Sequence, residues 1–211
     1  MKLPEGVERR GFDGTERLAT RGEPVYGEPT DGEWRAWNPH RSKLGAMPEL
    51  GLDTGLVGGE NVLYLGAAAG TTVSHVADFA GPTYAVEFAA RPMRDLLDAA
   101  ESRPRLFPLL ADARSPEEYA HVVEPVDVIV QDVATRGQAT VATTNARFLR
   151  EDGRLLMAVK ARSEDVTRDP AAVFADALEE LRGTYEILDS ERLTPYHDDH
   201  LGVVARPLSE P

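Results

Sequence analysis

The sequence predicts one α/β domain on a doubly wound, mostly parallel, Rossmann-like sheet of seven strands, with a small β-rich appendage before it. Its 211 residues fit one ordinary domain, whereas two full domains would be cramped. From Asn61 onward, short apolar segments alternate with helical ones. The short segments are apolar on both faces, as strands of a parallel sheet are when helices cover both of its sides.

The first 40 residues have the pattern expected of the appendage. Between Val7 and Trp37, short apolar stretches are interrupted by Gly and Pro at the spacing of small antiparallel strands. The turn signals are Arg21-Gly22-Glu23-Pro24, Tyr26-Gly27-Glu28-Pro29 and Asp31-Gly32. We therefore assign 1–40 to this appendage and expect Trp34 and Trp37 to pack in its core.

The main domain is assigned to 41–206 and begins with a helix over Ser42–Leu52, ended by Gly51 and Gly55. Its expected strands are Val62–Leu65, Thr83–Glu87, Leu106–Leu110, Val126–Gln131, Leu155–Lys160, Tyr185–Leu193 and Leu201–Arg206. Its other expected helices are Thr71–Phe79, Ala90–Glu101, Pro116–Val122, Gln138–Leu149 and Ala171–Leu181. The last residues, 207–211, have no apolar periodicity and are expected to form a flexible tail.

Composition restricts the possible chemistry. The absence of cysteine excludes disulfides, thiolate metal sites and cysteine nucleophiles. No apolar run approaches the roughly 20 residues that a membrane span needs, and the charged N-terminus is unlike a signal peptide. We therefore expect a cytoplasmic protein that makes no contact with membranes.

Charge is the second compositional feature. The 23 Lys and Arg residues against 36 Asp and Glu residues give a net charge of −13, and only Lys2, Lys43 and Lys160 are lysines. An acidic, lysine-poor surface is expected of a halophilic protein, because high salt screens long-range repulsion within a few ångströms. The alternative is an ordinary acidic cytosolic protein.

The loop after the first strand of the main domain predicts a nucleotide or nucleoside pocket. In such sheets, ligands bind at the carboxyl ends of the strands near the point where strand order reverses. Here Gly66 and Gly70 allow the backbone to approach a ligand. No lysine follows Gly70, which excludes the phosphate loop of an NTPase. Ala68 and Ala69 stand where a dinucleotide fingerprint requires glycine.

Two acidic residues indicate which ligand fits. Glu87 ends the second strand about 20 residues beyond the loop, where a carboxylate can accept from both ribose hydroxyls. Asp112 follows the third strand and can accept from an adenine amino group. The combination favours S-adenosylmethionine over NAD, because S-adenosylmethionine has a ribose and an adenine but no pyrophosphate.

At these residues the chain resembles fibrillarin. The resemblance begins with Gly70-Thr71-Thr72-Val73-Ser74-His75-Val76, followed by Val86-Glu87-Phe88. Further matching segments, in the family's order, are Trp37-Asn38-Pro39-His40-Arg41-Ser42-Lys43-Leu44, Asp112-Ala113, Gln131-Asp132-Val133-Ala134, Val159-Lys160-Ala161-Arg162-Ser163 and Tyr196 to His200. The resemblance spans about residues 7 to 206.

The resemblance implies a methyltransferase sheet and an archaeal S-adenosylmethionine-dependent ribose 2'-O-methyltransferase. Its substrates would be rRNA and tRNA, selected by box C/D guide RNA. It implies two protein partners, a Nop-domain scaffold protein and a kink-turn-binding protein of ribosomal type. Because the net charge opposes RNA binding, we expect weak intrinsic affinity for RNA and recruitment through the scaffold.

The resemblance also implies the site residues. Those around the reacting ribose oxygen are Lys43, Asp132, Lys160 and His200. Those expected at the cofactor are Gly66, Gly70, Thr71, Thr72, Glu87, Phe88, Asp112, Ala113, Asp132, Val133, Ala134 and Thr135. Thr135 stands where the family commonly has Gln, and Gln138 is the alternative source of an amide. Which lysine takes the hydroxyl proton stays open.

Competing interpretations remain for the function and for the histidines. The rival functions are a non-catalytic subunit of the same RNA particle, a protein glutamine methyltransferase and an NAD-linked oxidoreductase. His75 is expected to be a packing or capping residue. His197 and His200 lack a third placed ligand, so no metal site is expected.

Overall fold

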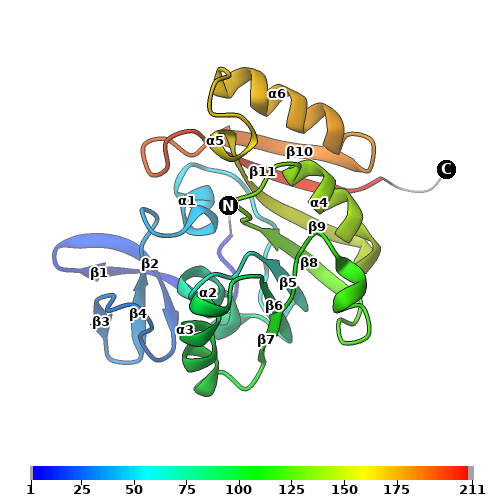
Figure 1. The fold of residues 1–211 in the computed structure, drawn as a ribbon. Helices are drawn as coiled ribbons and strands as arrows, with labels where there is room; N and C mark the ends of the chain where they lie inside the picture. The colour runs from blue at the N-terminus through cyan, green and yellow to red at the C-terminus, as the bar shows by residue number, and fades with distance from the viewer. Residues whose placement is uncertain (1, 209–211) are drawn as a thin grey trace.

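The computed structural model describes residues 2–208 and contains two sheets (Figure 1). The small N-terminal sheet is antiparallel, with the order β1-β2-β4-β3. Its strands are β1 (Val7–Phe12), β2 (Thr15–Arg21), β3 (Thr30–Asp31) and β4 (Trp34–Trp37). The β-rich character expected of the first 40 residues is therefore present. The main sheet has seven strands, as predicted, in the order β10-β11-β9-β8-β5-β6-β7.

The strands of the main sheet are β5 (Val62–Leu65), β6 (Thr83–Glu87), β7 (Leu106–Leu110), β8 (Val126–Gln131), β9 (Leu149–Lys160), β10 (Tyr185–Arg192) and β11 (His200–Pro207). The strands β5 to β9 pair in parallel, and β11 runs antiparallel to both of its neighbours. Along the chain, β6 and β7 are therefore added on one side of β5, and β8 and β9 are added on its other side. The order reverses between β5 and β8, which is the position where a doubly wound sheet binds its ligand.

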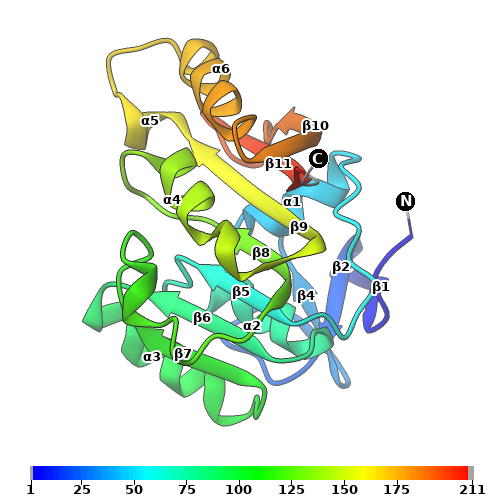
Figure 2. The same ribbon diagram turned by 90° about the vertical axis from the view of Figure 1, so that its right-hand side faces the viewer.

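Helices cover both faces of the main sheet (Figure 2). Their bounds are α1 (Lys43–Glu49), α2 (Thr71–Phe79), α3 (Ala90–Glu101), α4 (Gln138–Asn145), α5 (Ala161–Glu164) and α6 (Pro170–Leu181). Apolar side chains of α1, α2 and α3 pack in one core cluster, and those of α4 and α6 pack in the other. The first cluster also includes Val7, Leu18 and Trp37 of the small sheet, so the appendage shares the core of the main domain. The boundary between 40 and 41 stays a prediction.

Several bounds differ from those expected. β9 begins at Leu149 instead of Leu155, because Leu149 pairs with Val126 of β8 and Arg154 with Val128, with an irregular polar stretch between them. Helix α4 ends at Asn145 and continues as a 3-10 turn, and only a 3-10 turn forms over Pro116–Glu118. Pro207 lies in β11 and pairs with Tyr185 of β10. The prediction of a flexible tail is therefore wrong at residue 207. Residues 209–211 lie outside the described residues.

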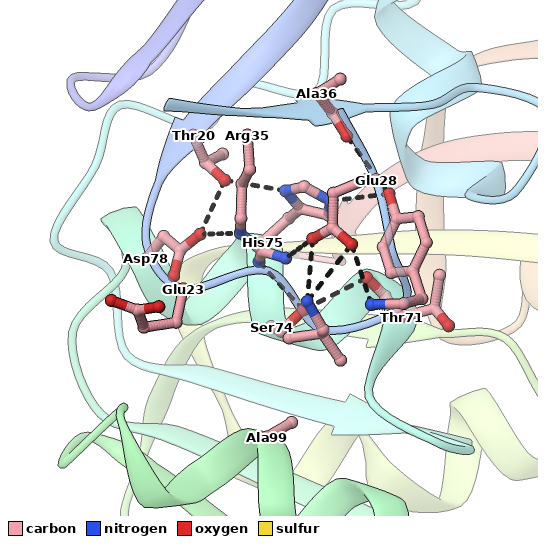
Figure 3. Close-up of polar contacts among 12 residues, drawn as sticks. Thr20, Glu23, Glu28, Arg35, Ala36, Thr71, Ser74, His75, Asp78 and Ala99 are labelled. Atoms are coloured by element: carbon pink, nitrogen blue, oxygen red, sulfur yellow. Dashed lines mark hydrogen bonds and ion pairs between the residues drawn. The ribbon is translucent and has the colours of Figure 1, made fainter. Parts of the chain in front are cut away.

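A buried charge cluster joins the small sheet to α2 and to Arg103, which follows α3; Figure 3 shows the part formed by Glu28, Arg35 and Asp78. The Asp78 carboxylate accepts from the Arg35 guanidinium at 2.8 Å and from the Arg103 guanidinium at 2.9 Å, and Arg35 also pairs with Glu28. The side chains of Arg35, Glu28 and Asp78 are at most 2% exposed. Burial of unpaired charges is costly, so the pairing fixes how the small sheet sits on α2.

His75 is part of this packing, as expected. Its ring stacks on Trp37 at 5.2 Å between centroids, and its nitrogens lie 2.7 Å from Thr20 Oγ1 and 3.0 Å from the Tyr26 hydroxyl. Burial, together with the nearby Arg35 and Arg103, holds the pKa of His75 well below its usual value. The residue is therefore a neutral core histidine.

Candidate cofactor and catalytic site

A cavity of about 340 Å³ opens at the carboxyl ends of β5, β6 and β8. Nine of the predicted cofactor residues line it: Gly66, Glu87, Phe88, Asp112, Ala113, Asp132, Val133, Ala134 and Thr135. The sequence interpretation did not include Ala68, Val86, Ala111, Arg114 and Val141, which also line it. The cavity therefore lies at the reversal of strand order, where the fold predicts a ligand.

Gly66 brings the ends of β5 and β8 together. Its φ is +84°, and a Cβ at this position would overlap the carbonyl oxygen of Asp132. The Gly66 amide donates to the Val86 carbonyl, and the Asp132 amide donates to the Leu65 carbonyl at 2.9 Å. Only glycine satisfies both the left-handed backbone and the close approach.

Glu87 presents a carboxylate that the backbone holds in place. Its Oε2 accepts from the amide of Ala68 at 2.8 Å, and its Oε1 accepts from the amide of Ala89 at 2.7 Å. The residue is 9% exposed. Each carboxylate oxygen has lone pairs for more than one donor, so both can still accept from a ligand.

Asp112 has a partner that sequence reasoning missed. The Arg114 guanidinium lies 2.6 Å from its Oδ2, and the side-chain hydrogen bond from Arg114 lowers the pKa of Asp112. Because Asp112 is 23% exposed and Arg114 is 58% exposed, solvent weakens the pair. Asp112 therefore stays an ionised acceptor at the rim of the cavity.

Three of the predicted cofactor residues lie elsewhere. Gly70 is the left-handed N-cap of α2, with φ +89°. Thr72 is buried, and its Oγ1 donates to Ser42 Oγ at 3.1 Å. Thr71 lines a separate hollow with Tyr26 and Arg41. These residues shape the loop without lining the cavity at the strand ends.

Lys43 and Asp132 form an ion pair at this cavity. The distance between Lys43 Nζ and Asp132 Oδ2 is 2.9 Å, with side chains 28% and 22% exposed. Lys43 opens α1 because Ser42 caps that helix by accepting from the Gly45 amide at 2.9 Å. The Trp37 indole also donates to Ser42 Oγ at 2.9 Å, so the start of α1 is fixed from the small sheet.

Lys160 and His200 face each other across the pairing of β9 and β11. The buried Gln138 side chain accepts from the Lys160 amide at 2.9 Å and donates to the Lys160 carbonyl at 3.0 Å. Gln138 does not line the cavity. Its amide therefore fixes the end of β9, and the suggestion that it replaces the family's Gln at the cofactor finds no support here.

His200 lies among the other three predicted catalytic residues. Burial lowers its pKa first, and the charges of Lys43 and Lys160 lower it further, whereas Asp132 raises it. The charges of Lys43, Asp132 and Lys160 therefore all act on the His200 ring. His200 Nδ1 is 2.6 Å from the Asp198 carbonyl oxygen, so this nitrogen carries the proton of the neutral ring. The structure thus brings all four predicted residues into one cluster.

Two other features are absent from residues 2–208. In this range no group of three or more His, Cys, Asp or Glu side chains is placed to hold a metal ion. None of the helices in this range has the length and apolar character to cross a membrane.

Comparison with known proteins gives consistent matches over nearly the whole chain. The family model described as Fibrillarin matches residues 10–208. A fibrillarin-like rRNA/tRNA 2'-O-methyltransferase from Haloarcula marismortui is 73% identical over 210 residues, which is 100% of both chains. A chain from the crystal structure of a fibrillarin/Nop5p complex has a TM-score of 0.91 at 41% identity, covering 99% of this chain and 100% of that one. Fibrillarin from Aeropyrum pernix, solved with natively bound S-adenosyl-L-methionine, has a TM-score of 0.81 at 44% identity, covering 95% and 94%.

Proposed function

This chain belongs to the fibrillarin family, and we propose that it transfers a methyl group from S-adenosylmethionine to ribose 2'-hydroxyls of rRNA and tRNA. One observation carries the proposal: Asp132 lines the cofactor cavity and also pairs with Lys43. The cofactor cavity and the acid–base cluster therefore share a residue. A methyl donor in the cavity and a hydroxyl beside Asp132 would be in contact.

The cavity fits S-adenosylmethionine in the chemistry of its lining. The fixed Glu87 carboxylate can accept from both ribose hydroxyls, and Asp112 can accept from the adenine amino group. Phe88 lines the cavity with 70% of its surface exposed, which gives the adenine ring an apolar face to cover. The relative from Aeropyrum pernix binds this cofactor.

When bound, S-adenosylmethionine would supply a methyl group carried on its sulfonium sulfur. The sulfur releases this methyl group without help from the protein. The protein has to align the ribose oxygen with that methyl group, and alignment is worth up to about 7 to 11 kcal/mol in favourable cases. Asp132 Oδ2 is taken by Lys43, and Oδ1 has no hydrogen-bond partner in residues 2–208. Asp132 Oδ1 is thus positioned to accept from the 2'-hydroxyl and orient it.

Lys160 supplies positive charge at the proposed reacting oxygen. Its backbone is fixed at both amide and carbonyl by Gln138, and no ion pair joins its ammonium group to a carboxylate in the part of the chain that the structure describes. A free ammonium group beside the reacting oxygen stabilises the alkoxide that forms as the proton leaves. The ion pair with Lys43 holds the Asp132 carboxylate in place.

The partners and setting form the rest of the proposal. A fibrillarin has been solved in complex with Nop5p, which supports a Nop-domain scaffold as partner of this chain. We further propose that the chain works with box C/D guide RNA and a kink-turn-binding protein of ribosomal type, and that it is located in the cytoplasm. The net charge of −13 and the relative from Haloarcula marismortui support function at high salt.

The proposal is tested by methyl transfer from labelled S-adenosylmethionine to a guide-paired RNA, with the scaffold and kink-turn proteins added. A target with 2'-deoxyribose at the guided position should lose the label. Labelling of both targets would mean a different acceptor atom, and a glutamine-containing peptide assayed in parallel would identify a protein methyltransferase. Cofactor binding without any labelling would favour a non-catalytic subunit.

A further inference from the structure

A further hollow, of about 210 Å³, lies between the β1–β2 hairpin and the loop that joins β10 to β11. Arg17 on β2, Asn38 and His40 before α1, and Tyr196 in the loop contribute to its walls. The proposed function uses none of these side chains. The hollow is nevertheless close in sequence to both ends of the catalytic cluster, because His40 precedes Lys43 and Tyr196 precedes His200.

The two loops that line this hollow are bound to each other. His197 Nε2 lies 2.8 Å from the Pro39 carbonyl oxygen, and the rings of His40 and Tyr196 meet edge to face at 5.0 Å between centroids. One loop leads directly into α1, and the other leads into β11. The hollow therefore has a fixed position relative to Lys43 and His200.

The charges around the hollow leave one cation without an acidic partner. Glu49, which also lines it, accepts three hydrogen bonds from the Arg9 guanidinium at 3.1 to 3.2 Å. Glu16 lies 3.9 Å from the same guanidinium. No ion pair or hydrogen bond joins the Arg17 guanidinium to a carboxylate within residues 2–208. In a chain with a net charge of −13, this leaves Arg17 able to bind an external anion.

We propose that this hollow holds the sugar–phosphate backbone of the target RNA beside the methylated nucleotide, with Arg17 contacting a phosphate. The inference rests on the proposed function, because a ribose held at Asp132 continues into flanking phosphates on both sides. Proteins recognise paired RNA mostly through phosphates and 2'-hydroxyls. Asn38, His40 and Tyr196 carry hydrogen-bonding groups suited to such contacts. The hollow would therefore position the strand without reading its sequence.

The test compares Arg17→Gln with Arg10→Gln in the assembled particle of scaffold, kink-turn protein and guide RNA. Arg10 is the matched control, because it lies directly opposite Arg17 in the hairpin and is already paired with Asp31 at 2.9 Å and with Glu8 at 3.3 Å. Loss of a charge-assisted phosphate contact should raise the KM for target RNA about tenfold, with a much smaller change in kcat. The salt dependence of RNA affinity should also fall by about one phosphate contact, a slope change of about 0.7 to 0.9.

A double-mutant cycle identifies the phosphate. Single methylphosphonate linkages, which carry no charge, are placed at each position around the target nucleotide and tested with wild type and Arg17→Gln. At one linkage the two changes should be strongly non-additive, because each removes the same contact. Additivity at every linkage, or an equal KM effect in Arg10→Gln, would overturn the inference while leaving the methyltransferase function intact. A wild-type particle that methylates no guided target would instead refute the proposed function.

Discussion

Replacing Asp78 by Asn should destabilise the protein far more than removal of an exposed carboxylate. The Asp78 carboxylate accepts from Thr20 Oγ1 at 2.7 Å, from Arg35 Nε at 2.8 Å and from Arg103 Nε at 2.9 Å. The amide is nearly the same size, but it removes the negative charge and turns one acceptor into a donor that faces donors. Both guanidinium groups are at most 5% exposed, so water cannot replace the lost acceptor.

The size of the effect follows from what each arginine retains. Breaking a buried ion pair typically costs 3–5 kcal/mol, roughly, because the remaining charge is left uncompensated. Arg35 keeps its ion pair with Glu28, whereas Arg103 keeps only neutral partners such as the carbonyls of Ala99 and Glu23. Burial raises the pKa of Asp78 despite the two arginines, so desolvation of this carboxylate offsets part of their attraction. We therefore expect a loss near the lower end, about 3 kcal/mol.

Urea unfolding at constant high KCl, followed by tryptophan fluorescence, measures this loss. Trp37 stacks on His75 beside the cluster, so its emission reports on the affected region. The control is Asp176→Asn, which removes an ion pair with Arg168 whose side chains are 65% and 46% exposed. Exposed pairs contribute about 0 to 1 kcal/mol. Equal, small losses in Asp78→Asn and Asp176→Asn would refute the reasoning that uncompensated buried arginines are costly here.

Asp132→Ala and Lys160→Ala should each abolish methyl transfer while the circular dichroism spectrum stays unchanged, and normal turnover in either variant would remove that residue from the catalytic set. Glu87→Gln should weaken binding of S-adenosylmethionine by about 10- to 100-fold, because hydrogen bonds to a charged group are worth about 1.5–3 kcal/mol; calorimetry showing unchanged affinity would contradict the ribose contact. Because burial holds the pKa of His200 below its ordinary value, the unfolded chain binds more protons there, so stability should fall as pH drops through about 6.5. Urea unfolding across that range should show a weaker pH dependence in His200→Gln, and an identical dependence would contradict a neutral His200.

The strands and helices of the main domain were predictable because the apolar residues within each one repeat with the period of a strand or of a helix. The strand Val62–Leu65 and the helix Thr71–Phe79 agree with the structure at both ends. The polar start of β9 was not predictable, because pairing with β8 extends that strand beyond its apolar half. Periodicity reports burial within one segment, whereas strand pairing depends on a partner elsewhere in the chain.

In the candidate site, too, signals within one segment were predictable and contacts between distant segments were not. Spacing after the glycine loop indicated Glu87, and the structure places its carboxylate at the cavity. The role of Gln138 was missed, because its contacts with the backbone of Lys160 join residues that local pattern leaves unrelated. The predicted catalytic cluster rested on the resemblance, since no spacing in the sequence relates Lys43 to Asp132.

The net charge of −13 and a reaction on RNA are compatible if attraction acts only at short range. At 1 M salt the Debye length is about 3 Å, so neither repulsion by the acidic surface nor long-range steering survives. Contacts at hydrogen-bonding distance are screened much less when they are partly buried. Two of the three lysines, Lys43 and Lys160, lie in the predicted catalytic cluster, and Arg17 lines the hollow with His40 and Tyr196 without a carboxylate partner in residues 2–208. Such a distribution places these cations where the proposed function requires the RNA to be aligned, and we expect the scaffold to recruit the RNA.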